Sequence, residues 1–436
     1  MRTQIAIAPL IFLSIVVITG CSDTNSNAPD AVNDAPKIAP HPSTKNASGR
    51  DSNTLVKIET DDMPTNATNS QAEGVIDIDS DNMDGLNSIS LSADGMRALT
   101  GTPQGVAILW DLTEGARLHA LVGHNGSVVA VSLSADGRRA ITGSYDKTAI
   151  LWDTDAGTKL RSFAGHSDWV VSARLSRDGT RALTGSMDTT AIMWDALTGE
   201  KIRTFSGHTS GVLSVALSED GKRVVTGSYD KNAIVWDTET GEKLKTLKGH
   251  SNIVESVSLS ADGKRILTGS DDRCAIVWDA QTARPIHTFR GHDGWVMSVY
   301  LSADGRWALT SSDDKTAMLW EADTGKVRNV FSGHRDSVLS ASLSEDQKHV
   351  WTVSGGDGTT RIWNASTARE LCQLISFDVG EDWLVVSPDG FFDGSQNAAS
   401  LASRRFEAES ETVPLVNYRT KFERPGLLRS ILSDNQ

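Results

Sequence analysis

The sequence is poor in positive charge. It carries 42 Lys and Arg residues against 56 Asp and Glu among 436 residues, which gives a formal net charge of −14. Nonspecific nucleic-acid binding requires a basic surface, and so does direct attraction to anionic lipid headgroups. We therefore expect no nucleic-acid partner and no membrane-binding face made of cations.

A long apolar segment is also missing. The longest apolar run, from Ile5 to Ile18, has about 14 residues, whereas a membrane-spanning helix needs about 20. The run follows one early cation, Arg2, and ends in Ile18-Thr19-Gly20-Cys21. This pattern predicts that residues 1–20 are a secretory signal peptide rather than a transmembrane helix.

The Gly-Cys ending resembles the bacterial lipobox, which implies cleavage before Cys21 and lipid modification of that residue. An ordinary cleaved signal followed by an incidental cysteine is the alternative. Each buried methylene of an acyl chain adds about 0.8 kcal/mol, so several chains on Cys21 would anchor the protein stably. Ser22, rather than Asp, follows the cysteine. By resemblance to lipoprotein sorting in two-membrane bacteria, this implies the periplasmic face of the outer membrane.

Large apolar side chains are scarce from residue 21 to residue 73. This segment is rich in Ser, Thr, Asn, Asp, Pro and Ala. Such a composition cannot bury enough surface to offset the entropy of ordering the chain. We expect a disordered tether between the lipid anchor and the folded part.

What the sequence does contain is a repeat with a period of 42 residues. A Gly-His pair recurs at His124, His166, His208, His250, His292 and His334. A Trp near the end of each unit recurs with the same spacing at Trp110, Trp152, Trp194, Trp236, Trp278 and Trp320, and a seventh stands at Trp363. Each unit holds short runs of alternating or β-branched residues separated by turn residues such as Ser-Ala-Asp-Gly. Four strands per unit form a small sheet, and such sheets must stack around an axis to bury their faces.

These signatures, Gly-His, Ser-X-Asp-Gly, Thr-Gly-Ser-X-Asp and Trp-Asp, resemble those of the WD-repeat β-propeller family. The resemblance implies an all-β, seven-bladed propeller over residues 74–376. Residues 377–436, which echo half a repeat and look helical after Pro425, are expected to form a half-blade or C-terminal cap. An eight-bladed ring completed by N-terminal strands is the alternative.

The family also implies a hydrogen-bonded set of His, Thr, Asp and Trp in each blade. The sets are His124, Thr142, Asp146, Trp152; His166, Thr184, Asp188, Trp194; His208, Thr226, Asp230, Trp236; His250, Thr268, Asp272, Trp278; His292, Thr310, Asp314, Trp320; and His334, Thr352, Asp357, Trp363. A hydroxyl, an imidazole and a carboxylate could form a nucleophilic triad, but an active site is needed once and this set occurs six times. We interpret the sets as structural.

Blade one departs from the pattern, because Asn82 and Gln104 stand where the His and the turn Asp are expected. Only Thr100 and Trp110 remain of its set, so this blade is expected to be the least firmly held. The segment Ile76 to Asp79 lies one period before Leu118 to Leu121, a fourth-strand position. It is therefore predicted to pair with the last blade and close the ring.

Two cysteines fall inside the propeller. Cys274 lies in the third strand of blade five and Cys372 in the fourth strand of blade seven, with blade six between them. A disulfide needs closer Cα atoms than this separation allows. We expect two buried free thiols and no metal site; the acidic run from Asp77 to Asp84 lacks the glycine and glutamate of a calcium loop.

Differences between near-identical units indicate where partners bind. On the loops that carry Gly-His and Thr-Gly-Ser-X-Asp, these variable positions combine aromatic, sulfur and acidic side chains: Trp169, Trp295, Tyr145, Tyr229, Met187, Asp271 and Asp313. Exposed Trp and Tyr are frequent at interface hot spots. For Trp169 and Trp295, packing between blades is an equal alternative; Tyr145 and Tyr229 are expected to be exposed, and the acidic pair suits a basic partner.

Two classes of function follow. The first is a non-enzymatic, monomeric scaffold, lipid-anchored at the cell envelope, which binds other envelope proteins through this rim and needs no cofactor. The second is an enzyme or cofactor protein that uses the central channel, as quinone-dependent or lactone-hydrolysing propellers do. Outside the six sets, the repeat region holds only His119, His287 and His349, on different strands. The scaffold is therefore the favoured hypothesis.

Overall fold

The structure is a computed structural model, and it describes residues 74–78, 86–377, 380–406, 413–415 and 419–433. The signal peptide, Cys21 and the tether predicted from the sequence lie outside the described residues. All described residues belong to one compact unit of the chain. None of the described helices is long and apolar enough to cross a membrane.

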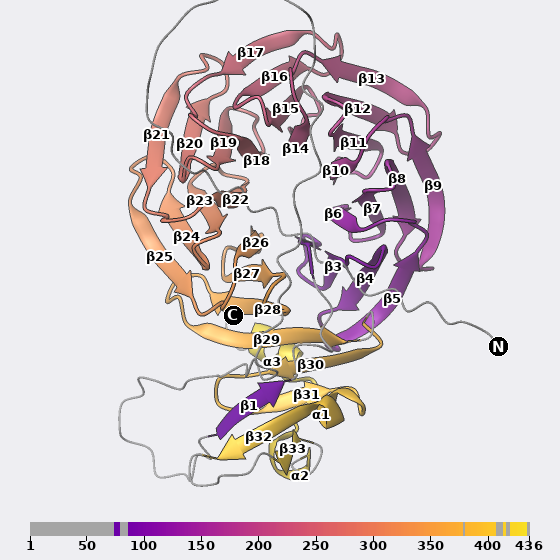
Figure 1. Ribbon diagram of the computed structural model, residues 1–436, viewed down its shortest axis with the longest axis vertical. Helices are drawn as coiled ribbons and strands as arrows, with labels where there is room; N and C mark the ends of the chain where they lie inside the picture. Colours follow the sequence, from indigo (N-terminus) through magenta and orange to yellow (C-terminus); the bar gives the residue numbers. More distant parts are fainter. Residues whose placement is uncertain (1–73, 79–85, 378–379, 407–412, 416–418, 434–436) are drawn as a thin grey trace, which may run out of the picture. The chain divides into compact units, whose positions relative to one another are not determined.

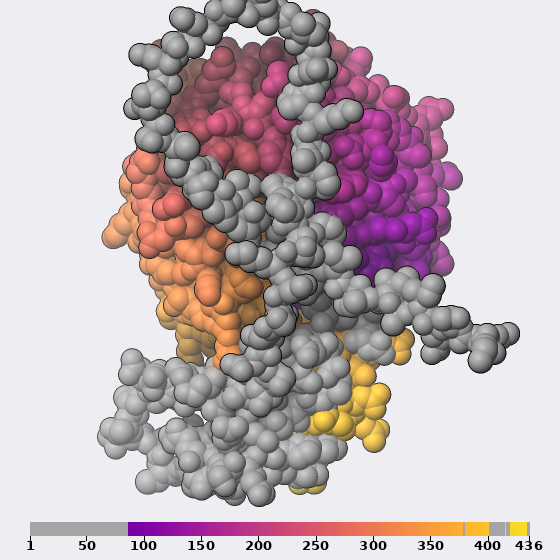
Figure 2. All heavy atoms as spheres, viewed as in Figure 1, coloured from indigo at the N-terminus to yellow at the C-terminus, as the bar shows by residue number. Residues whose placement is uncertain are grey.

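Seven antiparallel sheets surround a central channel, so the prediction of a seven-bladed propeller is confirmed and the eight-bladed alternative is excluded. The first strand of each blade lies at the channel and the fourth at the perimeter (Figure 1). In the space-filling view the blades follow one another from indigo to orange, with the C-terminal segment in yellow (Figure 2).

The strands of each blade are consecutive in the chain. They are β2–β5 (Ser88–Leu91, Arg97–Gly101, Val106–Asp111, Ala116–Val122), β6–β9 (Val128–Leu133, Arg139–Ser144, Thr148–Asp153, Thr158–Ala164), β10–β13 (Val170–Leu175, Arg181–Ser186, Thr190–Asp195, Lys201–Ser206), β14–β17 (Val212–Leu217, Arg223–Ser228, Ala233–Asp237, Lys243–Leu247), β18–β21 (Val254–Leu259, Arg265–Ser270, Cys274–Asp279, Pro285–Arg290), β22–β25 (Val296–Leu301, Trp307–Ser312, Thr316–Glu321, Val327–Ser332) and β26–β29 (Val338–Leu343, His349–Ser354, Thr359–Asn364, Glu370–Phe377).

The turns between these strands use specific polar residues and glycines. In blade two the Ser134 hydroxyl donates to Asp136 at 2.7 Å, and Gly137 adopts φ +66°. Glycine reaches this left-handed conformation without steric cost, which explains its place in the Ser-X-Asp-Gly turns.

The turn between the second and third strands uses the same conformation without glycine. Thr189 has φ +73°, and blade seven places Gly358 there with φ +68°. A β-branched residue in the left-handed region is strained by about 1 kcal/mol or more.

Thr189→Gly is therefore expected to raise the free energy of unfolding by up to about 1 kcal/mol, measured by chemical denaturation. Gly358→Ala is the matched control and should destabilise; equal stability of Thr189→Gly and wild type would show that the turn is not strained.

Neighbouring blades are joined by hydrogen bonds that repeat around much of the ring. Near the channel, backbone N–H groups donate to a serine of the preceding blade, as from Val215 to Ser172 at 3.1 Å. At the other end of the sheets, an arginine donates to a glycine carbonyl of the next blade, as from Arg139 to Gly179 at 2.8 Å. These bonds satisfy edge groups that would otherwise remain unpaired.

The junction between blades seven and one is built differently. Trp307 and His349 occupy the arginine position in blades six and seven, so neither can form the guanidinium bond to the next blade. Instead, helix α3 (Leu427–Ser433) packs Leu427 and Leu428 into an apolar cluster. That cluster contains residues of blade one, among them Leu86, Ile89 and Trp110, and of blade seven, among them Trp351, Val353 and Ile362. The C-terminal helix expected after Pro425 is confirmed.

The prediction that the Ile76–Asp79 segment closes the ring is wrong. Strand β1 (Gly74–Ile78) pairs with β32 (Ala402–Phe406), which also pairs with β33 (Val413–Pro414) in a separate three-stranded sheet. Blade seven supplies its own fourth strand, β29, so it offers no vacancy for an N-terminal strand.

The strands that follow residue 377 form the predicted half-blade rather than a cap over the ring. Strands β30 (Asp382–Val386) and β31 (Phe392–Gly394) continue the sheet of blade seven outward to six strands, and lie outside the perimeter in Figure 1. Two short helices, α1 (Ala398–Leu401) and α2 (Arg419–Phe422), contribute Ala398, Ala399 and Phe422 to an apolar cluster with β30 and β31. The half-repeat therefore widens one blade, because its strands find an exposed sheet edge at β29.

Both cysteines within the described residues are free and buried, as predicted.

Candidate functional site

The six predicted sets of polar residues each come together in the structure. In blade three, His166 Nδ1 lies 2.8 Å from Asp188 Oδ2 and Nε2 lies 2.8 Å from Thr184 Oγ1, which also accepts from Trp194 Nε1 at 2.9 Å. The carboxylate accepts from Nδ1–H, so Nε2 is the acceptor for the Thr184 hydroxyl. This fixes one neutral tautomer of a buried imidazole, and burial correspondingly lowers the pKa of the equivalent His124 and His208.

The other blades repeat this geometry within 0.1 Å or so, with His–Asp separations of 2.7–2.9 Å. Blade one keeps only the bond from Trp110 to Thr100, at 3.0 Å, and Asn82 lies outside the described residues. A hydroxyl that already bonds a buried Trp and a buried His is held in the core. It is placed for stability, not for attack on a substrate.

These sets organise one face of the propeller, the face formed by the Gly-His loops and the Thr-Gly-Ser-X-Asp turns, which we call the upper face. Asp188 Oδ2 also accepts from the Ser167 backbone N–H at 3.0 Å, which ties the loop to the turn. Next to it, the Met187 N–H donates to the Trp169 carbonyl at 3.0 Å. The same bond joins Asp313 to Trp295 at 2.9 Å. Four of the variable positions identified from the sequence are therefore joined in two pairs, Trp169 with Met187 and Trp295 with Asp313.

Blades two to four carry an aromatic and sulfur-containing arc on the upper face. Trp169 is 45% exposed and stacks on Tyr145 of the preceding blade, with ring centroids 4.5 Å apart and planes at 25°. Met187 lies against Gly211, where an added Cβ would come 2.9 Å from its sulfur. Tyr229 follows on the same blade as Gly211 and is half-buried, as Tyr145 is. The expectation that the two tyrosines are exposed is thus met only in part, because both are half-buried.

Blades five to seven carry an acidic arc. Asp271 is half-buried, Asp313 is exposed, and the Ser337 hydroxyl of blade seven donates to Asp313. Trp295 is half-buried beneath this arc rather than exposed like Trp169. The two tryptophans proposed as equivalent therefore have different environments.

Glu255 completes the acidic arc. It lies on β18, and its carboxyl group is close enough to that of Asp271 for each to influence the pKa of the other. Burial, and then the negative charge of Asp271, raises the pKa of Glu255 to about 8. Burial also raises the pKa of Tyr229 to about 12, with a further contribution from Glu255 and Asp271. Burial likewise raises the pKa of Asp271 to about 6, so the two neighbouring carboxyl groups are both ionised only at a cost.

Glu255→Gln is expected to stabilise the protein, and more so at higher pH. The folded-state pKa of Glu255 is raised above its unfolded value, so this residue lowers stability progressively as the pH rises from about 4.5 to 8. A neutral amide removes that cost, which we expect to be about 1–2 kcal/mol at pH 8 and near zero at pH 4.5. Urea denaturation at several pH values measures the difference, with exposed Glu219→Gln as control. A pH-independent difference would contradict the raised pKa of Glu255.

Sequence reasoning missed Glu255, although a signal was present. The equivalent inner-strand position holds an apolar residue in the five neighbouring units: Val129, Val171, Leu213, Met297 and Leu339. Glu255 is thus a carboxylate at a position where these units have apolar residues. Because it does not recur, the repeat itself does not require it for its structure. Among the described residues, no group of three or more His, Cys, Asp or Glu side chains could hold a metal ion.

Six segments of the chain match the family model described as "WD domain, G-beta repeat": residues 115–153, 157–195, 199–237, 241–279, 283–321 and 325–364. Together they cover more than half of the chain. The chain belongs to the WD-repeat family. No curated protein matches it.

The matched segments start after the first three strands of blade one, which is the blade of this WD-repeat protein that lacks the His and the turn Asp. WD-repeat propellers commonly mediate protein–protein interactions and are typically non-enzymatic scaffolds.

Proposed function

We propose that this WD-repeat protein is a non-enzymatic scaffold that binds partner proteins through its upper face. The observation that carries the proposal is the exposure of Trp169. The chain has 12 tryptophans, and Trp169 alone among them belongs to the exposed large apolar side chains. An exposed indole stacked on a tyrosine is a rigid apolar anchor of the kind that dominates interface energetics.

The two arcs favour a partner segment with both an apolar and a cationic side chain. The apolar group would cover Trp169 and Tyr145, and the cation would approach Asp313 and the Glu255–Asp271 pair. Opposite charge across an interface raises the association rate and selects against acidic partners. Binding is therefore expected to weaken at high ionic strength.

Lipid anchoring at the bacterial cell envelope, on the periplasmic face of the outer membrane, is the second part of the proposal. It rests on Cys21 at the end of the predicted signal peptide, which lies outside the described residues. Metabolic labelling with palmitate tests it: wild type should incorporate label and sediment with membranes, whereas Cys21→Ser should do neither. Equal labelling of both proteins would overturn the anchor at this residue.

The alternative, an enzyme or cofactor protein that uses the channel, lacks a comparable observation. The hydroxyl, imidazole and carboxylate groups closest in geometry to a catalytic set are the six buried sets that hold the blades together. Detection of a stoichiometric quinone or metal in the purified protein would favour this alternative.

Capture of partners from detergent-solubilised envelope tests the scaffold proposal. Wild type, Trp169→Ala and a control variant, Leu197→Ala, would be compared as bait. Leu197 is also an exposed apolar residue, 51% exposed, but it lies in a turn on the opposite face. A protein retained by wild type and Leu197→Ala and lost by Trp169→Ala supports the proposal. Equal retention by all three would move the binding surface away from the upper face.

A further inference from the structure

The opposite, lower mouth of the channel contains a cavity of about 500 Å³. Its walls include one leucine from the inner strand of every blade: Leu91, Leu133, Leu175, Leu217, Leu259, Leu301 and Leu343. Cavities of this size accommodate small molecules. This one combines the ring of leucines with serines and charged side chains of the inner strands and their turns. The polar groups in this cavity therefore indicate what it could bind.

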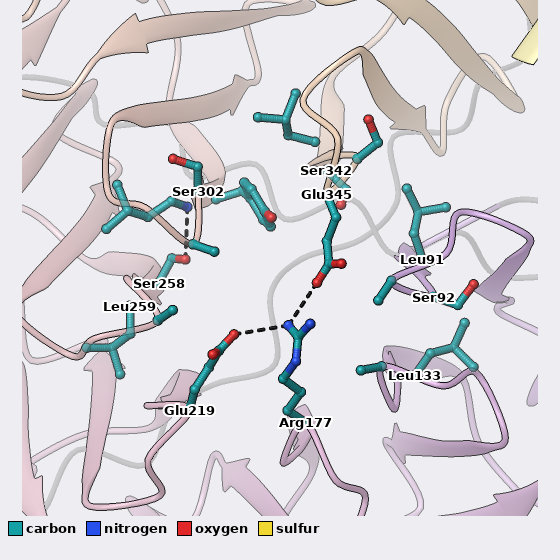
Figure 3. A pocket seen from close by; sticks show the side chains of 18 of the residues that line it. Leu91, Ser92, Leu133, Arg177, Glu219, Ser258, Leu259, Ser302, Ser342 and Glu345 are labelled. Atoms are coloured by element: carbon teal, nitrogen blue, oxygen red, sulfur yellow. Dashed lines mark hydrogen bonds and ion pairs between the residues drawn. The ribbon is translucent and has the colours of Figure 1, made fainter. Parts of the chain in front are cut away.

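An ion-pair bridge crosses the mouth. Arg177 of blade three lies 3.1 Å from Glu219 of blade four and 2.8 Å from Glu345 of blade seven, as Figure 3 shows. All three residues replace the alanine found in other Ser-Ala-Asp-Gly turns. Their side chains are 42–49% exposed, and ion pairs with this exposure contribute little stability. The bridge neutralises its own charges and can open at low cost.

Arg174 lies in the same cavity and has no such partner. Within the part of the chain that the structure describes, it forms no hydrogen bond or ion pair. It occupies an inner-strand position that holds a serine, alanine or tyrosine in the other blades: Ser90, Ser132, Ala216, Ser258, Tyr300 and Ser342. The Arg174 side chain is exposed to the channel that it lines, and the surrounding blades lower the pKa of Arg174. A guanidinium that faces a channel and has no partner of its own is free to form charge-assisted hydrogen bonds with an anion.

Two further polar groups line the cavity. Burial raises the pKa of Tyr300 to about 12, so its hydroxyl stays protonated and can donate a hydrogen bond. His349 is 6% exposed, and its Nε2 atom has no hydrogen-bond partner. The acidic residues at the rim, Asp94 and Asp346, each accept from a serine of their own turn at 2.6 Å. Arg174 is thus the one wall charge within the described cavity that is neither paired nor held by its own turn.

We propose that this cavity binds a small organic carboxylate with an apolar body. The carboxylate would pair with Arg174, the hydrocarbon would pack against the leucine walls, and the Arg177 bridge would act as a latch at the mouth. This site is separate from the upper face and does not depend on the proposed scaffold function.

Isothermal titration of the full-length protein with octanoate tests the proposal. Inorganic phosphate and octylammonium serve as probes that lack the apolar body or reverse the charge. Wild type should bind octanoate more tightly than either. Arg174→Ser should lower octanoate affinity at least tenfold and keep the wild-type melting temperature, because serine occupies this position in four other blades. Arg306→Ser, an exposed arginine outside the cavity, should bind as wild type does.

A second variant tests the latch. Arg177→Ala should leave octanoate affinity within about threefold of wild type while raising the association rate in stopped-flow measurements. Several results would overturn the proposal: no octanoate binding by wild type, equal binding by Arg174→Ser, or equal affinity for octylammonium. Phosphate binding as tight as octanoate binding would contradict the role of the apolar walls.

Discussion

Leu428→Ala should lower the free energy of unfolding by about 3 kcal/mol. Leu428 is 1% exposed and belongs to the apolar cluster that joins blade seven to blade one. Its Cβ would lie 3.5 Å from a Cβ added to Gly115, so the helix sits directly on the loop of blade one. Removal of the side chain leaves a cavity at one of the two junctions that lack the arginine–glycine bond.

Chemical denaturation of the full-length protein measures this effect. Leu197→Ala, which truncates a leucine that is 51% exposed, is the matched control and should change stability by less than about 0.5 kcal/mol. A loss below about 1 kcal/mol for Leu428→Ala would mean that the ring closes without help from α3.

The second large effect is expected from Thr226→Val. The Thr226 hydroxyl accepts from Trp236 Nε1 at 2.9 Å and pairs with His208 Nε2 at 2.7 Å. Valine has a similar shape but leaves both buried groups without a partner, at about 1–3 kcal/mol for each. We expect a total loss of about 3 kcal/mol in the free energy of unfolding.

Thr204→Val is the control, because Thr204 is an exposed threonine on the outer strand of the neighbouring blade. It should be nearly neutral or slightly stabilising, since valine favours strands. If Thr226→Val were equally neutral, the polar sets would not be the main fasteners of the blades.

The repeat carried most of the fold. A period of 42 residues, alternating strands and fixed turn residues predicted both the seven blades and the polar sets. This was possible because the same residues recur at the same offsets in six or seven units. The upper-face residues could also be placed, since their offset from the Trp fixes their loop. Whether Trp169 or Trp295 is exposed could not be predicted, because exposure depends on the side chain of the neighbouring blade.

Ring closure was the part that repetition could not predict. Strand β1 has the spacing of a fourth strand, yet it pairs with β32, more than 300 residues later in the chain. Residues 377–436 echo only half a repeat, so the repeat does not predict which strand they pair with. Glu255 and Arg174 were missed for a related reason. Sequence analysis concentrated on residues that recur in every unit, whereas these two differ from the residues at the equivalent positions of the other units.

The proposed function rests on the upper face, and its most direct test is the affinity of a partner obtained by envelope capture. The dissociation constant of the reconstituted complex would be measured for wild type, Trp169→Ala and Leu197→Ala. We predict that Trp169→Ala weakens binding about 30-fold, as expected for loss of a 2 kcal/mol anchor, and that Leu197→Ala binds as wild type does. An unchanged dissociation constant for Trp169→Ala would contradict the central proposal that this face holds the partner.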